Sequence, residues 1–162
     1  MRAVFFLLLL GLLGGPPAMA QTSPAHTSAT RAHALRLRPG DDLRDALLAY
    51  TAAHHLKAGA VLTCVGSLTV ATLRLANQEG PTEYHGHFEI VSLVGTLSST
   101  GGSHLHLSIA DSTGRTLGGH LLAGCRVYTT AEIVLAELPE LEFGRETDPT
   151  FGYKELVVKP KR

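Results

Sequence analysis

The segment from Ser103 to Gly114 constrains the fold more than any other stretch of the chain. From Ser103 to Ala110, leucine or isoleucine alternates with histidine or serine, which is the period-two pattern of a β-strand with one apolar face. The residues at 111–114 are Asp-Ser-Thr-Gly. They predict a tight turn, because Asp favours the first turn position and Gly tolerates a positive φ. The segment therefore predicts a β-hairpin whose second strand begins near Arg115.

The length of this turn decides which face of the hairpin a third histidine occupies. A three-residue loop that ends at Gly114 makes His106 face His120 directly across the hairpin. His104 then lies on the same face, diagonally opposite His120 and within reach of it. A two-residue loop would turn His120 to the opposite face. The glycine at the third loop position favours the first register.

Three histidines on one face form a candidate metal site. Neutral imidazoles are good zinc ligands, and three of them with an open fourth position are typical of catalytic zinc centres. The pattern therefore predicts that His104, His106 and His120 bind zinc or another divalent metal. The alternative is that they are polar residues on the solvent face of an antiparallel hairpin. Because each ligand must be deprotonated, the metal affinity is expected to fall below about pH 6.

The N-terminal stretch predicts export. A basic residue precedes an apolar run from Phe5 to Leu13, and residues 18–20 read Ala-Met-Ala, which fits a cleavage site. Residues 1–20 are therefore predicted to be a signal peptide, and the mature protein to be periplasmic or secreted. The apolar run is short for a membrane span, so no membrane association is expected after cleavage. A retained membrane anchor is the alternative.

The rest of the chain divides into a linker, one domain and a tail. Residues 21–33 are rich in Ser, Thr, Ala and Pro without periodicity, which predicts a disordered linker. Residues 34–158 are numerous enough to form one domain with its own core. Residues 159–162 are a short tail. The 14 basic side chains balance the 14 acidic ones, which argues against a nucleic-acid groove or a polybasic membrane patch.

Periodicity within the domain predicts one helix and several strands. Apolar residues recur at helical spacing over 42–55, after an Asp that suits the N-cap position. The second arm of the hairpin is expected to continue through Val127. These elements predict an α+β fold with one main helix packed on an antiparallel-dominated mixed sheet. The remaining strands are expected at 33–38, 59–68, 70–76, 85–97, 131–138, 141–144 and 153–158.

Glu89 and Arg74 are candidates for catalysis. Glu89 lies between apolar neighbours, where a carboxylate requires an ion-pair partner or has a raised pKa that suits acid–base chemistry. Arg74 is either that partner or a bidentate ligand for a substrate carboxylate. The sequence alone does not fix the distance of either residue from the hairpin.

The chain has two cysteines, Cys64 and Cys125, and both lie in apolar strand patterns. An exported protein permits a disulfide between them. Buried free thiols are equally compatible with the pattern. The sequence leaves both alternatives open.

The sequence contains four characteristic blocks, at residues 62–74, 86–97, 104–121 and 129–133. Together they resemble the plant-and-prokaryote-conserved (PPC) domain, in its stand-alone prokaryotic form. The resemblance implies a compact homotrimer. It also implies a fold shared with acetolactate decarboxylase, an enzyme that binds zinc through an H-x-H motif and a later His. His104, His106 and His120 are similar in type and order to those ligands.

The resemblance implies three alternative functions. The first is an exported trimeric module that binds a small molecule, a divalent metal or both. The second is a metal-dependent, decarboxylase-like enzyme acting on a small carboxylate. The third is a DNA-binding regulator, as in the plant members. The sequence disfavours the third, because it contains no Arg-Gly-Arg-Pro hook and has Gly86-His87-Phe88 where the plant motif has Gly-Arg-Phe.

Overall fold

The computed structural model describes residues 24–161, so the predicted signal peptide lies outside the described residues. Eight strands and one helix make up this part of the chain, which confirms the predicted α+β class. In chain order they are β1 (Arg31–Leu37), α1 (Leu43–Ala53), β2 (Gly59–Arg74), β3 (Thr82–Ser98), β4 (Gly102–Ala110), β5 (Thr116–Leu121), β6 (Arg126–Glu137), β7 (Leu141–Thr147) and β8 (Lys154–Pro160).

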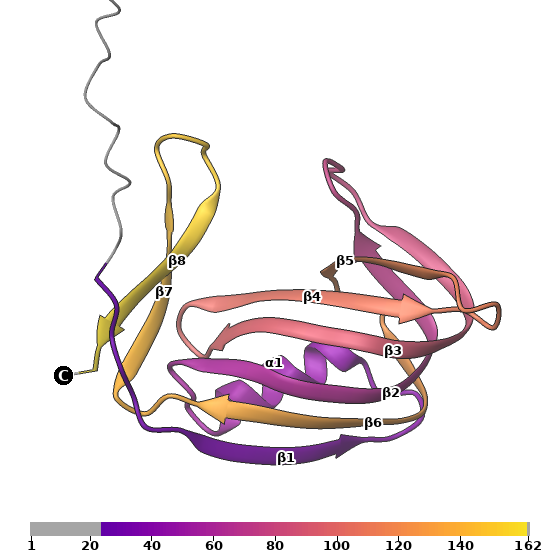
Figure 1. Cartoon of the computed structure of the whole chain (residues 1–162), viewed down its shortest axis with the longest axis horizontal. Helices are drawn as coiled ribbons and strands as arrows, with labels where there is room; N and C mark the ends of the chain where they lie inside the picture. Colours follow the sequence, from indigo (N-terminus) through magenta and orange to yellow (C-terminus); the bar gives the residue numbers. More distant parts are fainter. Residues whose placement is uncertain (1–23, 162) are drawn as a thin grey trace, which may run out of the picture.

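Six strands form one sheet in the order β1-β6-β2-β3-β4-β5. The expected antiparallel dominance is confirmed, and no parallel pair occurs among the described strands. The sheet also closes on itself, because the end of β2 pairs with β5. β7 and β8 form a separate two-stranded sheet that stands at one end of the larger one (Figure 1).

Helix α1 covers one face of the sheet, as Figure 1 shows. Asp42 is its N-cap, as predicted, and its side chain accepts hydrogen bonds from the backbone N–H groups of Arg44 and Asp45. Leu43 and Leu47 are fully buried against the sheet. The helix therefore provides the second layer that the apolar sheet face requires.

The core lies between α1 and the inner face of the sheet. Leu105, Leu107 and Ile109 of β4 are buried there, as the alternation in the sequence predicts. Cys64 and Cys125 are also buried, and both are free thiols. Burial raises the pKa of Cys64 to about 12 and that of Cys125 to about 11. Both cysteines therefore behave as apolar core residues that resist deprotonation.

Several strand boundaries differ from the predictions. β5 ends at Leu121, and the chain turns at Gly124, with φ of 105°, before β6 begins, so the hairpin arm does not continue through Val127. The two strands expected between 59 and 76 are one strand, β2, because bulges interrupt its register without ending it. β1 begins at Arg31, so the last part of the segment expected as a linker belongs to the sheet.

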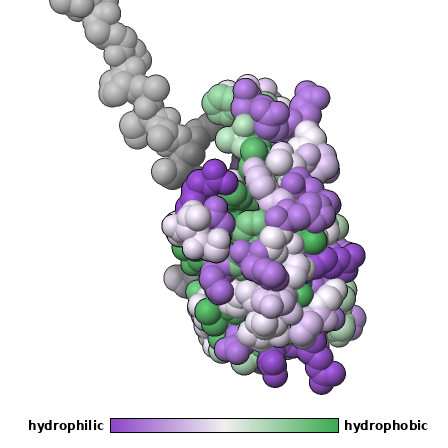
Figure 2. All heavy atoms as spheres, turned by 90° about the vertical axis from the view of Figure 1, so that its right-hand side faces the viewer, coloured by the Kyte–Doolittle hydropathy of each residue, from purple (hydrophilic) through white to green (hydrophobic). Residues whose placement is uncertain are grey.

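The surface at the right-hand end of the molecule in Figure 1 has no segregated apolar or polar face. Figure 2 shows that hydrophilic residues are interspersed there with hydrophobic ones. Such mixing is usual for a soluble surface and by itself marks no binding face. Within residues 24–161, no helix is both long and apolar enough to cross a membrane.

Candidate metal centre and its cleft

The β4–β5 hairpin has the register that the turn sequence favours. The backbone N–H of Asp111 donates to the carbonyl of Arg115 at 3.0 Å, and Gly114 takes a φ of 81°. His106 is paired with His120. The three-residue loop therefore places both of these histidines and His104 on the outer face of the hairpin, opposite the buried leucines.

The three imidazoles converge on one point. The Nε2 atom of His106 lies 3.1 Å from Nε2 of His104 and 3.1 Å from Nδ1 of His120. The three candidate ligand atoms all lie within 4.8 Å of one another. Nitrogen ligands at about 2.0–2.1 Å from a tetrahedral zinc are separated by about 3.3 Å. The observed spacing is therefore close to that of a three-histidine metal site.

A glycine allows β2 to approach β5 and position His120. Arg74 pairs with His120 where the sheet closes. A Cβ atom on Gly119 would lie 2.7 Å from the carbonyl oxygen of Arg74, closer than Cβ contacts normally are. Any side chain at this position would push the strands apart. Gly119 therefore permits the close approach of the β2 backbone.

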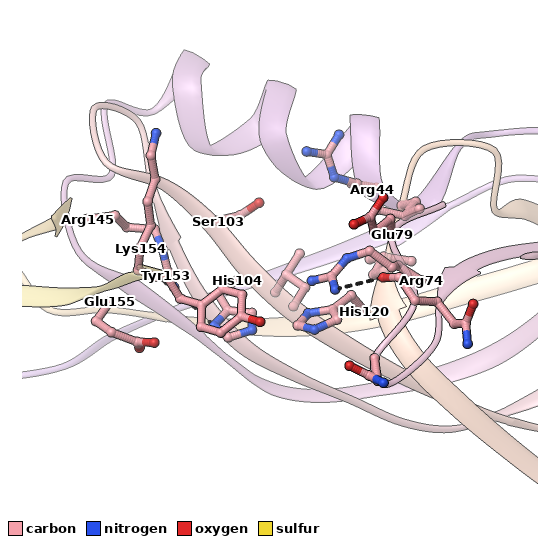
Figure 3. Close-up of a pocket in the computed structure, with 15 residues that line it drawn as sticks. Arg44, Arg74, Glu79, Ser103, His104, His120, Arg145, Tyr153, Lys154 and Glu155 are labelled. Atoms are coloured by element: carbon pink, nitrogen blue, oxygen red, sulfur yellow. Dashed lines mark hydrogen bonds between the residues drawn. The ribbon is translucent and has the colours of Figure 1, made fainter. Parts of the chain in front are cut away.

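His104 and His120 lie in a cleft of about 920 Å³ between two walls. The end of β2 and the loop after it form one wall, and the β7–β8 hairpin forms the other. In Figure 3 the two imidazoles lie between side chains from both walls. The first wall contributes Arg74, Asn77, Gln78 and Glu79, and the second contributes Arg145, Tyr153, Lys154 and Glu155.

The cleft keeps two of the imidazoles neutral. Burial lowers the pKa of His104 below its usual range, and the positive charge of Arg145 lowers it further. Burial also lowers the pKa of His120, with Arg74 as the next cause. Both rings therefore offer lone pairs at neutral pH, which is the state that metal coordination requires.

Arg145 is a site residue that the sequence reasoning missed. Its Nη2 atom donates to the backbone carbonyl of Lys154 at 2.6 Å and lies 3.2 Å from Nδ1 of His104. Because a guanidinium only donates hydrogen bonds, this Nδ1 is an acceptor. The signal was present in β7, where Arg145 continues the alternation of the buried residues Leu141 and Phe143. A charged residue at that position points toward the body of the protein.

The ion pair between Glu89 and Arg74, one of the two alternatives for these residues, does not form. Glu89 is exposed and lies opposite Ser67 on β2. Arg74 lies seven positions further along β2 than Ser67, a distance of roughly 20 Å. The Arg74 guanidinium instead donates to the carbonyl of Gln78 at 3.4 Å (Figure 3). Arg74 therefore belongs to the cleft, whereas Glu89 lies away from it on the outer face of β3.

Solved structures share this fold. A hypothetical protein from Salmonella cholerae-suis is 44% identical, with a TM-score of 0.83 over 85% of this chain and 99% of that protein. A metal-containing protein from Archaeoglobus fulgidus is 22% identical, with a TM-score of 0.73 over 83% of this chain and 99% of that protein. At that identity, the second comparison shows the fold alone.

Two curated relatives extend the comparison to longer proteins. The bifunctional protein GlmU of Synechococcus sp. strain JA-2-3B'a(2-13) is 46% identical over 151 residues, which are 93% of this chain and 23% of that protein. The AT-hook motif nuclear-localized protein 13 of Arabidopsis thaliana is 34% identical over 144 residues, which are 79% of this chain and 31% of that protein. The chain thus spans under a third of the length of either relative.

A family model confirms the resemblance that the sequence blocks indicated. The model of the Plants and Prokaryotes Conserved (PCC) domain matches residues 25–139. The matched range includes the helix and all six strands of the larger sheet, but it ends before β7 and β8. The chain therefore belongs to the Plants and Prokaryotes Conserved domain family.

Proposed function

We propose that this protein binds one divalent metal ion at His104, His106 and His120 and a small molecule in the adjoining cleft. The convergence of three imidazole nitrogens, two of them 3.1 Å from the Nε2 atom of His106, carries the proposal. The metal-containing protein from Archaeoglobus fulgidus has the same fold, which adds support. Three nitrogen ligands and an open position favour zinc.

A metal-dependent enzyme acting on a small carboxylate is the second candidate. Arg74 favours it, because a guanidinium beside the histidines can hold a carboxylate by two parallel hydrogen bonds. A zinc ion at the site would supply a Lewis acid that polarises a substrate oxygen. The protein itself would supply orientation of the substrate through Arg74. Glu89 has no part in this proposal, because it lies away from the cleft.

Metal content tests the first proposal. Purified protein, supplied with zinc and then freed of excess, is expected to retain about one equivalent per chain. The double variant H106A/H120A is expected to retain almost none while keeping its fold, because the buried face of the hairpin is unchanged. His54→Ala, outside the cleft, is the matched control. Retention by the wild type of less than about a tenth of an equivalent per chain would refute the metal site and the enzyme alternative that depends on it.

We also propose that the protein assembles as a trimer. Four large apolar side chains are more than half exposed on the neighbouring strands β2 and β3, where a second subunit would cover them. Light scattering is expected to give three times the monomer mass, and a stable monomer at micromolar concentration would contradict the proposal. The four side chains are Leu62, Val65, Val91 and Val94.

Export is a further part of the proposal. The apolar run near the N-terminus and the Ala-Met-Ala sequence at 18–20 support it. Mature protein isolated from its host is expected to begin at Gln21, and soluble cytoplasmic protein that retains Met1 would contradict export.

A role in DNA binding ranks last among the candidate functions, because the net charge of the chain is zero. A gel shift at physiological salt tests that role.

A further inference from the structure

The cleft concentrates positive charge on a chain that has no net charge. Six charged side chains line the cleft, and the four cationic ones outnumber the two acidic ones. The whole chain balances 14 basic side chains with 14 acidic ones. A concave surface with an excess of one sign attracts small molecules of the opposite sign. The cationic side chains are Arg44, Arg74, Arg145 and Lys154, and the acidic ones are Glu79 and Glu155.

Two of the arginines reach the histidines from opposite walls. Arg74 is paired through its backbone with His120, and Arg145 lies 3.2 Å from the Nδ1 atom of His104. Figure 3 shows Arg74 beside His120 and Arg145 on the far side of His104. Both side chains are half-buried, so each loses little freedom when it binds a ligand. Two guanidinium groups facing one space match a ligand with two negative charges.

We propose that the cleft binds a small dianion between Arg74 and Arg145, next to the three histidines. The shared chemistry is that of a phosphate-type group or a short dicarboxylate, both of which accept paired hydrogen bonds from guanidinium groups. This inference builds on the proposed metal site and specifies the class of small molecule that the cleft takes. It assigns Arg145, on the tail hairpin, to ligand binding.

Arg145 also links the dianion to the metal site. Its guanidinium now donates to Nδ1 of His104, which requires a lone pair on that atom. A neutral His104 that offers Nε2 to a metal carries its proton on Nδ1 instead. The hydrogen bond from Arg145 is then lost, and its donors become free for the dianion. Metal loading is therefore expected to strengthen dianion binding, and the dianion to strengthen metal binding by the same factor.

Calorimetric titration at constant ionic strength tests the inference. Inorganic phosphate, malonate and acetate are titrated separately into zinc-free and zinc-loaded protein. The better of the two dianions is expected to bind at least about tenfold more tightly than acetate, which has one charge. Comparison of phosphate with malonate identifies which kind of dianion the cleft prefers. Dianion binding is expected to be tighter to the zinc-loaded protein.

Three matched arginine variants locate the binding site. R74Q and R145Q are each expected to weaken dianion binding about tenfold or more. R38Q removes an exposed arginine outside the cleft and is expected to bind as the wild type does. Circular dichroism verifies that all three variants are folded. The inference is wrong if neither dianion binds more tightly than acetate, or if R74Q and R145Q behave like R38Q.

Zinc content, measured on the same samples, separates this inference from the proposed function. A wild type that holds no zinc refutes the metal site. Dianion binding that depends on Arg74 and Arg145 in such a protein would still support the anion site. A wild type that holds zinc but binds no dianion refutes only the anion site. Equal dianion affinity with and without zinc refutes the link through His104.

Discussion

Two groups of histidines differ in what their ring nitrogens contact. One group is His33 and His54 beside Tyr50, and the other is His104, His106 and His120 beside the cleft. On β1, Nδ1 of His33 lies 3.0 Å from the hydroxyl of Tyr50 in the last turn of α1, and its Nε2 lies 3.3 Å from a carboxylate oxygen of Glu137. His54 stacks on Tyr50, with 3.9 Å between ring centroids, and its Nδ1 lies 3.0 Å from the Tyr50 backbone carbonyl. These nitrogens have hydroxyl, carboxylate or carbonyl partners, so the group joins β1, β6 and α1.

The histidines of the cleft face one another instead. His106 Nε2 lies 3.1 Å from a nitrogen of His104 and 3.1 Å from a nitrogen of His120. A ring nitrogen carries either one proton or one lone pair, so this atom forms a full hydrogen bond with only one of them. A metal ion would satisfy all three nitrogens at once. The partners of an imidazole, rather than its presence, therefore distinguish a structural histidine from a candidate ligand.

The largest difference between the two groups is expected in metal affinity. His120→Ala removes one of three converging nitrogens, so zinc affinity should fall at least about 100-fold. His54→Ala removes a nitrogen that bonds only to the Tyr50 carbonyl, and affinity should not change. Competition with a chromophoric chelator measures both variants. Equal zinc affinities of the two variants would show that His120 is no more a metal ligand than His54 is.

Gly119→Val tests whether the close approach of β2 and β5 is needed to hold His120 in place. The added side chain would collide with the Arg74 carbonyl, so the free energy of unfolding is expected to fall by about 1–3 kcal/mol. Zinc affinity should fall as well, because His120 shifts with its strand. Gly80→Val is the control, since a Cβ atom there meets nothing within 4 Å. Urea unfolding and chelator competition measure the two effects, and a fully stable Gly119→Val variant would contradict the argument.

Loss of His33, from the group beside Tyr50, is expected to lower stability without affecting metal binding. His33→Ala leaves Tyr50 and Glu137 without their shared partner, so the free energy of unfolding should fall by about 1–3 kcal/mol. Zinc content should equal that of the wild type. His85→Ala removes an exposed histidine paired with Glu83 and should change stability by less than about 0.5 kcal/mol. If His33→Ala lost zinc but not stability, the assignment of the two groups would be reversed.

The smallest expected effect is in the pH dependence of the zinc-free protein. Because the pKa values of His104 and His120 are lowered by burial, the unfolded chain binds more protons as pH falls below about 6.5. Their contribution to stability is therefore present above that pH and declines as pH falls toward the folded-state values. Urea unfolding at pH 7.5 and pH 5.0 measures the change. The double variant H104Q/H120Q should show a weaker decline, and an identical decline would contradict the prediction.

The hairpin was predictable because its information is local. The Asp-Ser-Thr-Gly turn sets the register, and the register alone brings His106 opposite His120. The alternation of residues 103–110 likewise identifies Leu105 and Leu107 as core. Each of these inferences depends on residues close together in the chain.

The rest of the site depends on contacts between distant parts of the chain. Arg145 reaches His104 through the β7–β8 hairpin, whose position over the cleft no local pattern encodes. The error at Glu89 has a different cause. Phe88 and Ile90 are both buried, so strand alternation places Glu89 on the outer face, whereas its apolar neighbours alone suggested a carboxylate that requires a partner. Period-two geometry applied residue by residue would have avoided that error.

The β7–β8 hairpin has consequences for how fast the cleft can be entered. It packs through a small cluster of its own, in which Ala58, Leu141 and Phe143 are buried, separate from the main core. Segments with few buried contacts open with a smaller free energy than the body of a protein. The hairpin that bears Arg145 is therefore expected to open at a smaller free energy than the strands that bear the histidines. Ligand exchange would then follow the opening rate of this hairpin, whereas ligand affinity would follow the chemistry of the cleft.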